Sequence, residues 1–116
     1  MYKLIENYFS FKDDRGEIRG LVNFGNWQEV NYVKSYKDTV RGNHYHKKTK
    51  EVIIILDGKI NVELKSGDNV EALTLKKGDV ILIEPMTIHT FTMLEDSSWI
   101  NLMNVKNEKD APDIYK

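Results

Sequence analysis

The three histidines of this chain lie in two short stretches, and their spacing suits metal binding or acid–base chemistry. Residues 41–51 read RGNHYHKKTKE, which places His44 and His46 one residue apart and Glu51 five positions further on. Side chains at positions i and i+2 of a β-strand point to the same face, so both imidazoles are expected to enter one cavity. His89 follows on a separate predicted strand. Three histidines and one carboxylate form a mixed ligand set that suits Zn, Mn, Fe, Co or Ni.

Strand-like patterns cover most of the chain and must position these side chains. The run Val52–Leu56 is continuously apolar and mostly β-branched, which predicts a strand buried on both faces. Alternation of apolar and polar residues, or a short apolar run, marks the other predicted strands at 59–64, 69–75, 79–84, 89–94 and 99–105. Turn-forming stretches rich in glycine, aspartate and serine separate them. Short strands at such regular spacing predict an all-β sandwich or barrel.

Length and composition indicate one folded domain over residues 1–116, with a polar tail from about residue 106. The formal net charge of −1 gives no field that would draw the protein to nucleic acid or to an anionic membrane. The absence of cysteine excludes disulfides and thiolate chemistry. No apolar run approaches the ~20 residues of a membrane helix, and the charged N-terminus does not resemble a signal peptide. We therefore expect a cytoplasmic protein.

The histidine pattern resembles the two cupin motifs. After His46 come four residues, then Glu51, then six further residues, then Gly58; in the second motif Gly78 lies eleven positions before His89. This resemblance implies a double-stranded β-helix, or jelly-roll barrel, with the metal ligands His44, His46, Glu51 and His89 inside it. Asp38 and Met86 stand where the motifs usually carry glycine, but no ligand position is lost.

Two further segments narrow the likeness to cupins that act on sugar nucleotides. Residues 41–47, RGNHYHK, resemble the Arg-Gly-x-His segment of dTDP-4-dehydrorhamnose 3,5-epimerases, dTDP-sugar 3,4-ketoisomerases and the C-terminal cupin domain of capsular-polysaccharide enzymes. Residues 13–16, DDRG, resemble an Asp-x-Arg-Gly segment of the same enzymes. The resemblance implies substrate contacts by Arg15, Arg41 and Tyr45, and the planar guanidinium suits a diphosphate. Solvated surface charge remains the alternative for each arginine.

The activity implied is epimerisation or ketone migration on a nucleotide-linked 4-keto-sugar in surface-polysaccharide biosynthesis. The ketone acidifies the neighbouring C–H bonds, so a base can remove a proton and form an enediolate. Return of the proton to the opposite face inverts the carbon, whereas return to the former ketone carbon moves the carbonyl. The developing oxyanion must be stabilised, and a bound divalent metal is expected to do so.

The identity of the base stays open at this point. An imidazole that binds a metal through its lone pair cannot accept a proton at the same nitrogen. Either His44 and His46 are ligands and another group is the base, which we prefer on sequence grounds, or both histidines are the catalytic acid and base. Other base candidates are Tyr32, Tyr36, Tyr45 and Lys47.

Two other classes of function compete with the isomerase. Three histidines and a glutamate also suit a metal-dependent cupin oxygenase or another small-molecule metalloenzyme. A non-catalytic cupin that binds sugar or metal is the second alternative. Sugar-nucleotide cupins are typically homodimers that exchange N-terminal strands, and residues 1–11, MYKLIENYFSF, alternate loosely enough to form such a strand.

Overall fold

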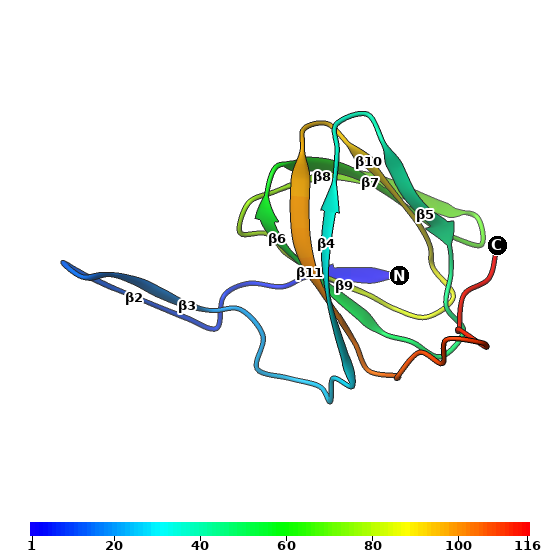
Figure 1. Ribbon diagram of the computed structural model, residues 1–116, viewed down its shortest axis with the longest axis horizontal. Helices are drawn as coiled ribbons and strands as arrows, with labels where there is room; N and C mark the ends of the chain where they lie inside the picture. The colour runs from blue at the N-terminus through cyan, green and yellow to red at the C-terminus, as the bar shows by residue number, and fades with distance from the viewer.

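The computed structural model describes all 116 residues, and its only regular elements are eleven β-strands (Figure 1). The all-β prediction is confirmed, and each of the six strands expected between residues 52 and 105 is present with ends shifted by at most a few residues. The chain has no helix with the length and apolarity that a membrane crossing requires. The strands are β1 Tyr2–Leu4, β2 Phe9–Asp13, β3 Gly16–Gly20, β4 Glu29–Ser35, β5 Val40–His44, β6 Glu51–Asp57, β7 Lys59–Ser66, β8 Asn69–Lys76, β9 Val80–Ile83, β10 Ile88–Met93 and β11 Ser97–Met103.

Two antiparallel sheets face each other across the core and form the expected jelly-roll barrel. One sheet has the order β1-β9-β6-β11-β4 and the other the order β5-β10-β7-β8 (Figure 1). The central strand β6 is buried on both faces, as its apolar run predicts: Ile53 and Ile55 belong to the core, and Val52 packs with Val80 on the other side. Leu21, Val22 and Trp27 cover this second apolar cluster from outside.

A β-bulge between β5 and β10 sets the positions of two histidines. His44 lies directly opposite His89, but the register shifts after this pair, so that Thr90 faces Gly42. Gly42 has a positive φ of 89°, and a Cβ at this position would lie 2.5 Å from the backbone oxygen of His89. Glycine therefore permits the close approach of β5 to β10 at the point where both strands carry a histidine.

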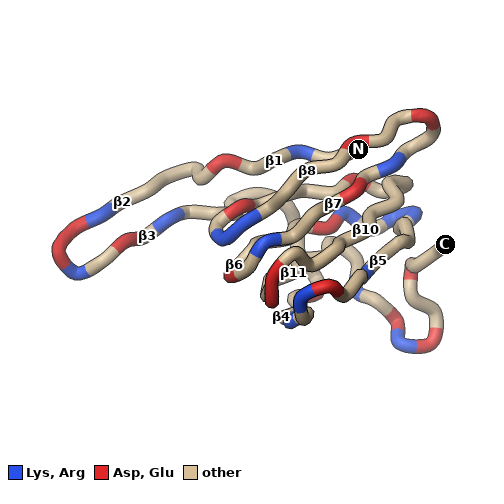
Figure 2. The backbone as a smooth tube through the Cα atoms, turned by 90° about the horizontal axis from the view of Figure 1, so that it is seen from above, with Lys and Arg blue, Asp and Glu red and all other residues tan.

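The β2–β3 hairpin projects away from the barrel as an arm (Figures 1 and 2). The segment expected as one N-terminal strand is instead two: β1 pairs with β9 of its own barrel, whereas Phe9 begins the arm. The arm exposes Phe9, Phe11 and Ile18, although its tip carries acidic and basic residues (Figure 2). Apolar side chains thus stay exposed on both strands of the arm in the single chain.

The C-terminal segment is polar, as expected, and it returns to the end of β5 (Figure 1). Tyr115 forms a two-bond antiparallel bridge with Tyr45, in which both N···O distances are 2.9 Å. The tail is thereby attached to the loop that follows His44.

Candidate active site

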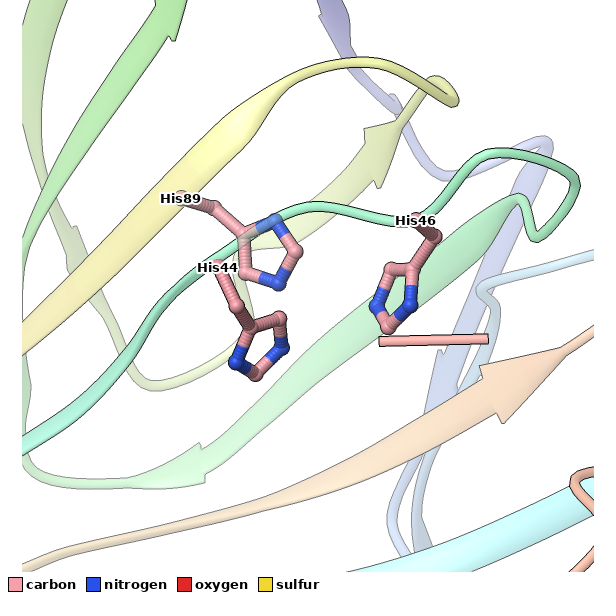
Figure 3. A group of neighbouring side chains, drawn as sticks. All are labelled: His44, His46 and His89. Atoms are coloured by element: carbon pink, nitrogen blue, oxygen red, sulfur yellow. The ribbon is translucent and has the colours of Figure 1, made fainter. Parts of the chain in front are cut away.

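Three imidazoles converge inside the barrel (Figure 3). His44 comes from β5, His46 from the loop just beyond it, and His89 from β10. One ring nitrogen of each histidine lies within 4.8 Å of the others. The His46 and His89 residues are only 3% and 1% exposed, whereas His44 is half-buried. The structure therefore brings together all three histidines that the sequence suggested.

Glu51 lies against two of these rings. Its Oε2 is 3.3 Å from His46 Nε2 and 3.5 Å from His89 Nε2, and the carboxylate is buried. The opposite nitrogens face backbone carbonyls: His46 Nδ1 donates to Asp113 O at 2.6 Å, and His89 Nδ1 donates to Thr87 O at 3.1 Å. Because a carbonyl can only accept, both Nδ1 atoms carry a hydrogen, and both Nε2 atoms face Glu51. The Glu51 carboxylate also only accepts, so both nitrogens of His46 are satisfied when this ring is protonated.

The environment pushes the pKa values of the histidines apart. Burial lowers the pKa of His44 to about 4, and the neighbouring His89 and His46 rings reinforce the effect. Burial alone would lower the pKa of His46 too, but its hydrogen bonds to Glu51 and to the Asp113 carbonyl prevail and raise it. A neutral imidazole beside one that favours its proton is the arrangement of a base and an acid.

The pKa values of His89 and Glu51 are both lowered. Burial lowers the pKa of His89. Burial would raise the pKa of Glu51, but its hydrogen bond with His46 and the nearby histidines outweigh burial and hold that pKa low. The site therefore contains one buried carboxylate that lies against two of the three imidazoles and hydrogen-bonds one of them, His46.

Two asparagine side chains, Asn101 on β11 and Asn31 on β4, support Glu51 in series. Asn101 Nδ2 donates to Glu51 Oε1, and Asn31 Nδ2 donates to Asn101 Oδ1 at 2.9 Å. Our sequence analysis missed both asparagines. The available signal was Asn101 at an inward position of β11, between Trp99 and Met103, where a polar side chain needs a buried partner.

Arg41 is held at the end of β4. It faces Phe91 across the β5–β10 pair, its Nε donates to Ser35 Oγ, and its Nη2 lies 3.4 Å from the backbone oxygen of Lys34. The side chain is exposed, so the guanidinium has donors left for an anion.

The other candidate site residues do not join the cluster. Tyr32 and Tyr36 are both 64% exposed, and Tyr32 must face outward because its neighbour Asn31 faces inward. Tyr45 and Lys47 both contact the Tyr115 ring, with a 5.6 Å centroid separation and a 4.2 Å cation–π distance respectively.

Arg15 lies furthest from the histidines. It occupies the turn at the tip of the arm, where its guanidinium pairs with Asp13 at 2.6 Å and its side chain is 83% exposed. This turn between β2 and β3 is the end of the arm that lies away from the barrel (Figure 1).

The histidine cluster fits a divalent metal. Three imidazole nitrogens meet, and two of the rings already donate their other nitrogen to a carbonyl, as metal-bound histidines commonly do. His44, His46 and His89 would hold the ion, with Glu51 beside them. This donor set suits Zn, Mn, Fe, Co or Ni.

Comparisons with known proteins agree with this architecture. The family model described as "FdtA: WxcM-like, C-terminal" matches residues 11–110. No match was found among curated protein sequences.

Three solved structures share the fold. A TDP complex of a double mutant of the QdtA 3,4-ketoisomerase from Thermoanaerobacterium thermosaccharolyticum is 24% identical, with a TM-score of 0.79 over 97% of this chain and 85% of that one. The WlaRB TDP-quinovose 3,4-ketoisomerase from Campylobacter jejuni is 20% identical, with a TM-score of 0.81 over 97% of this chain and 91% of that one. The dTDP-4-dehydrorhamnose 3,5-epimerase from Sulfolobus tokodaii is 22% identical, with a TM-score of 0.74 over 94% of this chain and 78% of that one.

Proposed function

Because the chain belongs to the FdtA, WxcM-like C-terminal family, we propose that it isomerises a nucleotide-linked 4-keto-sugar for surface-polysaccharide synthesis. The observation that carries this proposal is the pair of imidazoles with opposite proton preferences, His44 and His46, beside the buried carboxylate of Glu51. Abstraction of a proton next to a ketone requires a neutral base and a nearby acid, and this pair provides both.

His44 is the proposed base and His46 the proposed acid. His44 takes the proton from the carbon beside the ketone, and the electron pair of that C–H bond forms the C=C bond of an enol as the ketone oxygen is protonated. His46 donates its proton to the ketone oxygen and is kept protonated by Glu51. For ketone migration, protonated His44 delivers its proton to the former ketone carbon and the hydroxyl proton of the first carbon passes to His46, so that the carbonyl moves. For epimerisation, a proton is delivered to the opposite face of the first carbon and the enol proton returns to His46, so that the ketone is restored and the carbon is inverted. No net oxidation or loss of atoms occurs in either reaction.

A divalent metal is an alternative use of the same imidazoles. When bound by His44, His46 and His89, it would supply Lewis-acid stabilisation of the enediolate oxygen. Ligation would occupy nitrogens that proton transfer needs. We favour the acid–base role because none of the other base candidates, Tyr32, Tyr36, Tyr45 and Lys47, lies at the cluster to serve as a substitute base.

The nucleotide is the proposed anchor of the substrate. A similar structure is a TDP complex, and Arg41 presents unpaired guanidinium donors at the end of β4. A bidentate contact from Arg41 to the diphosphate would fix the sugar relative to the histidines.

We also propose a homodimer in which the two arms are exchanged. The apolar side chains of Phe9, Phe11 and Ile18 need a covering surface, and burial of each would contribute about 1.5–3 kcal/mol. An arm laid on a second copy would carry Arg15 away from its own histidines and toward the other barrel. Arg15 would then contact the diphosphate in the site of the partner.

The test is conversion of a dTDP- or UDP-linked 4-keto-6-deoxyhexose, followed by ¹³C NMR. We expect the carbonyl resonance to move from C4 to C3, or the configuration at C3 or C5 to invert. A folded protein that leaves both nucleotide sugars unchanged over hours would overturn the proposal.

A metal-dependent oxygenase is the second candidate, because the three converging imidazoles also suit Fe(II). Iron-dependent oxygen consumption in the presence of a small organic substrate would favour it. Conversion of the sugar nucleotide under nitrogen, with no oxygen consumed, would exclude oxygen chemistry from the reaction.

A further inference from the structure

The C-terminal tail holds the loop that follows His46 through a single carboxylate. Asp113 Oδ1 accepts the backbone N–H of Lys47 at 3.1 Å, and Oδ2 accepts those of Lys48 and Thr49 at 2.8 and 3.0 Å. Oδ2 also accepts the hydroxyl of Thr49 at 2.9 Å. Four donors from three consecutive residues thus converge on one side chain that is distant in sequence.

Asp113 also contacts the imidazole ring of His46, the proposed acid. The backbone oxygen of Asp113 accepts the hydrogen bond from His46 Nδ1 at 2.6 Å. The carboxylate therefore fixes the position of the backbone that offers this oxygen, relative to the loop that carries His46. The bridge between Tyr45 and Tyr115 restrains the tail on the other side of these contacts.

We propose that Asp113 is a positioning residue for His46. By anchoring the tail to residues 47–49, it keeps its own carbonyl at the Nδ1 atom and so holds the ring with Nε2 toward Glu51. The tail is then part of the active site although it touches no substrate. This inference rests on the proposed function for its kinetic consequence, whereas its structural consequence for His46 is independent of any activity.

The chemistry of the loop requires a carboxylate. All four partners of the side chain are donors, so both oxygens must accept. An asparagine can keep the three bonds at one oxygen, but its NH₂ group would oppose the N–H of Lys47. We therefore expect a graded effect, small in Asp113→Asn and large in Asp113→Ala.

The test uses the full chain in chelator, at a pH above the titration of His46, and records the side-chain ¹⁵N signals of all three histidines. In the wild type we expect His46 as the Nδ1–H tautomer. In Asp113→Ala we expect a mixture of both tautomers, with Asp113→Asn between. His89, whose Nδ1 bonds Thr87 O, is the internal control, and Asp110→Ala is the matched tail variant because Asp110 makes no side-chain hydrogen bond.

Kinetics of the sugar-nucleotide reaction supply the second readout. Loss of the hydrogen-bond partner that orients a metal-bound histidine typically lowers activity about 10- to 100-fold. We expect a loss of the same order for the proposed acid, with kcat of Asp113→Ala reduced and KM little changed. Unaltered His46 signals in folded Asp113→Ala would overturn the proposal, even if stability fell. Should Asp113→Ala fail to fold, unaltered signals in Asp113→Asn would overturn it equally. A wild type without isomerase activity but with the expected tautomer shift would refute only the proposed function.

Discussion

At the residue scale, three chemically identical side chains acquire three different properties from their surroundings. His46 gains a carboxylate partner, whereas His44 and His89 are mainly desolvated. The sequence spacing predicted that the rings would meet. It did not reveal which ring would hold a proton, because that depends on Glu51 and on a carbonyl from the other end of the chain.

The depressed pKa of His44 predicts a pH dependence of stability. Between its ordinary value of 6.5 and the folded value of about 4, the unfolded chain binds a proton that the folded chain does not. The free energy of unfolding is therefore unaffected by His44 above about pH 6.5, and it decreases as the pH falls from 6.5 toward 4. Urea unfolding in chelator at several pH values measures this decrease. Between pH 6.5 and 4, the free energy of unfolding should fall less in His44→Asn than in the wild type. Equal losses in both proteins would contradict the assigned environment.

Removal of the Glu51 charge should lower the pKa of His46, the proposed acid. Glu51→Gln keeps the shape of the side chain but removes the negative charge that favours protonated His46. We expect the pKa of His46 to fall in an NMR titration, and kcat at pH 7 to fall about 100-fold because the acid form is depleted. An unchanged His46 titration in the folded variant would show that Glu51 does not set its protonation.

At the element scale, the strands were predictable from the sequence, but the side-chain contacts between distant segments were predictable only in part. Apolar alternation located the strands because one face of each packs on the core. The inward asparagines and the attachment of the tail depend on partners some 66 to 70 residues away, as in the contacts of Asp113 and of Asn31. No local pattern encodes such contacts, so Asp113 was seen only as part of a polar tail.

The turns explain two departures from the cupin motifs. Asp38 and Met86, which stand where glycine is usual, have positive φ values of 69° and 64°. The backbone therefore keeps the left-handed conformation although the side chain has changed. This conformation costs an L-residue about 1–2 kcal/mol.

Met86→Gly should consequently stabilise the protein. Met86 is 54% exposed, so little packing is lost. Relief of the left-handed strain exceeds the extra freedom of glycine in the unfolded chain, with a net gain of roughly 0.5 kcal/mol in the free energy of unfolding. Urea denaturation measures this gain, and Met86→Val should shift stability in the opposite direction. A less stable Met86→Gly variant would show that the turn is not strained.

At the scale of the whole molecule, the projecting arm is the feature that one chain leaves unexplained. Its side chains alternate as in a half-buried hairpin, but nothing in the chain covers them. The sequence could suggest an exchanged N-terminal segment only by resemblance, since a covering surface on another copy has no signature within the segment itself.

A charge placed on the arm should separate the proposed dimer. Phe11→Asp would put a carboxylate into the apolar contact, so sedimentation velocity should detect a monomer where the wild type is a dimer. Val70→Asp is the control, because Val70 is similarly exposed but lies on β8, away from the arm. A wild type that sediments as a monomer would refute arm exchange.

The proposed role of Arg15 in the partner site predicts complementation between inactive variants. Arg15→Ala and His44→Asn should each be weakly active alone. After mixing and subunit exchange, one site of each heterodimer has both residues intact, and activity should recover. A mixture no more active than its components would place Arg15 outside the site.

The most direct test of the central claim is deuterium incorporation. Wild type, His44→Asn and His46→Asn are incubated in D₂O with a dTDP-linked 4-keto-6-deoxyhexose, with and without chelator, and C3 and C5 are followed by NMR. We predict that deuterium enters the carbon beside the ketone in the wild type with or without chelator, and that each variant slows its entry about 100-fold. Absence of exchange in the folded wild type, or exchange at an unchanged rate in both variants, would contradict proton transfer by this histidine pair.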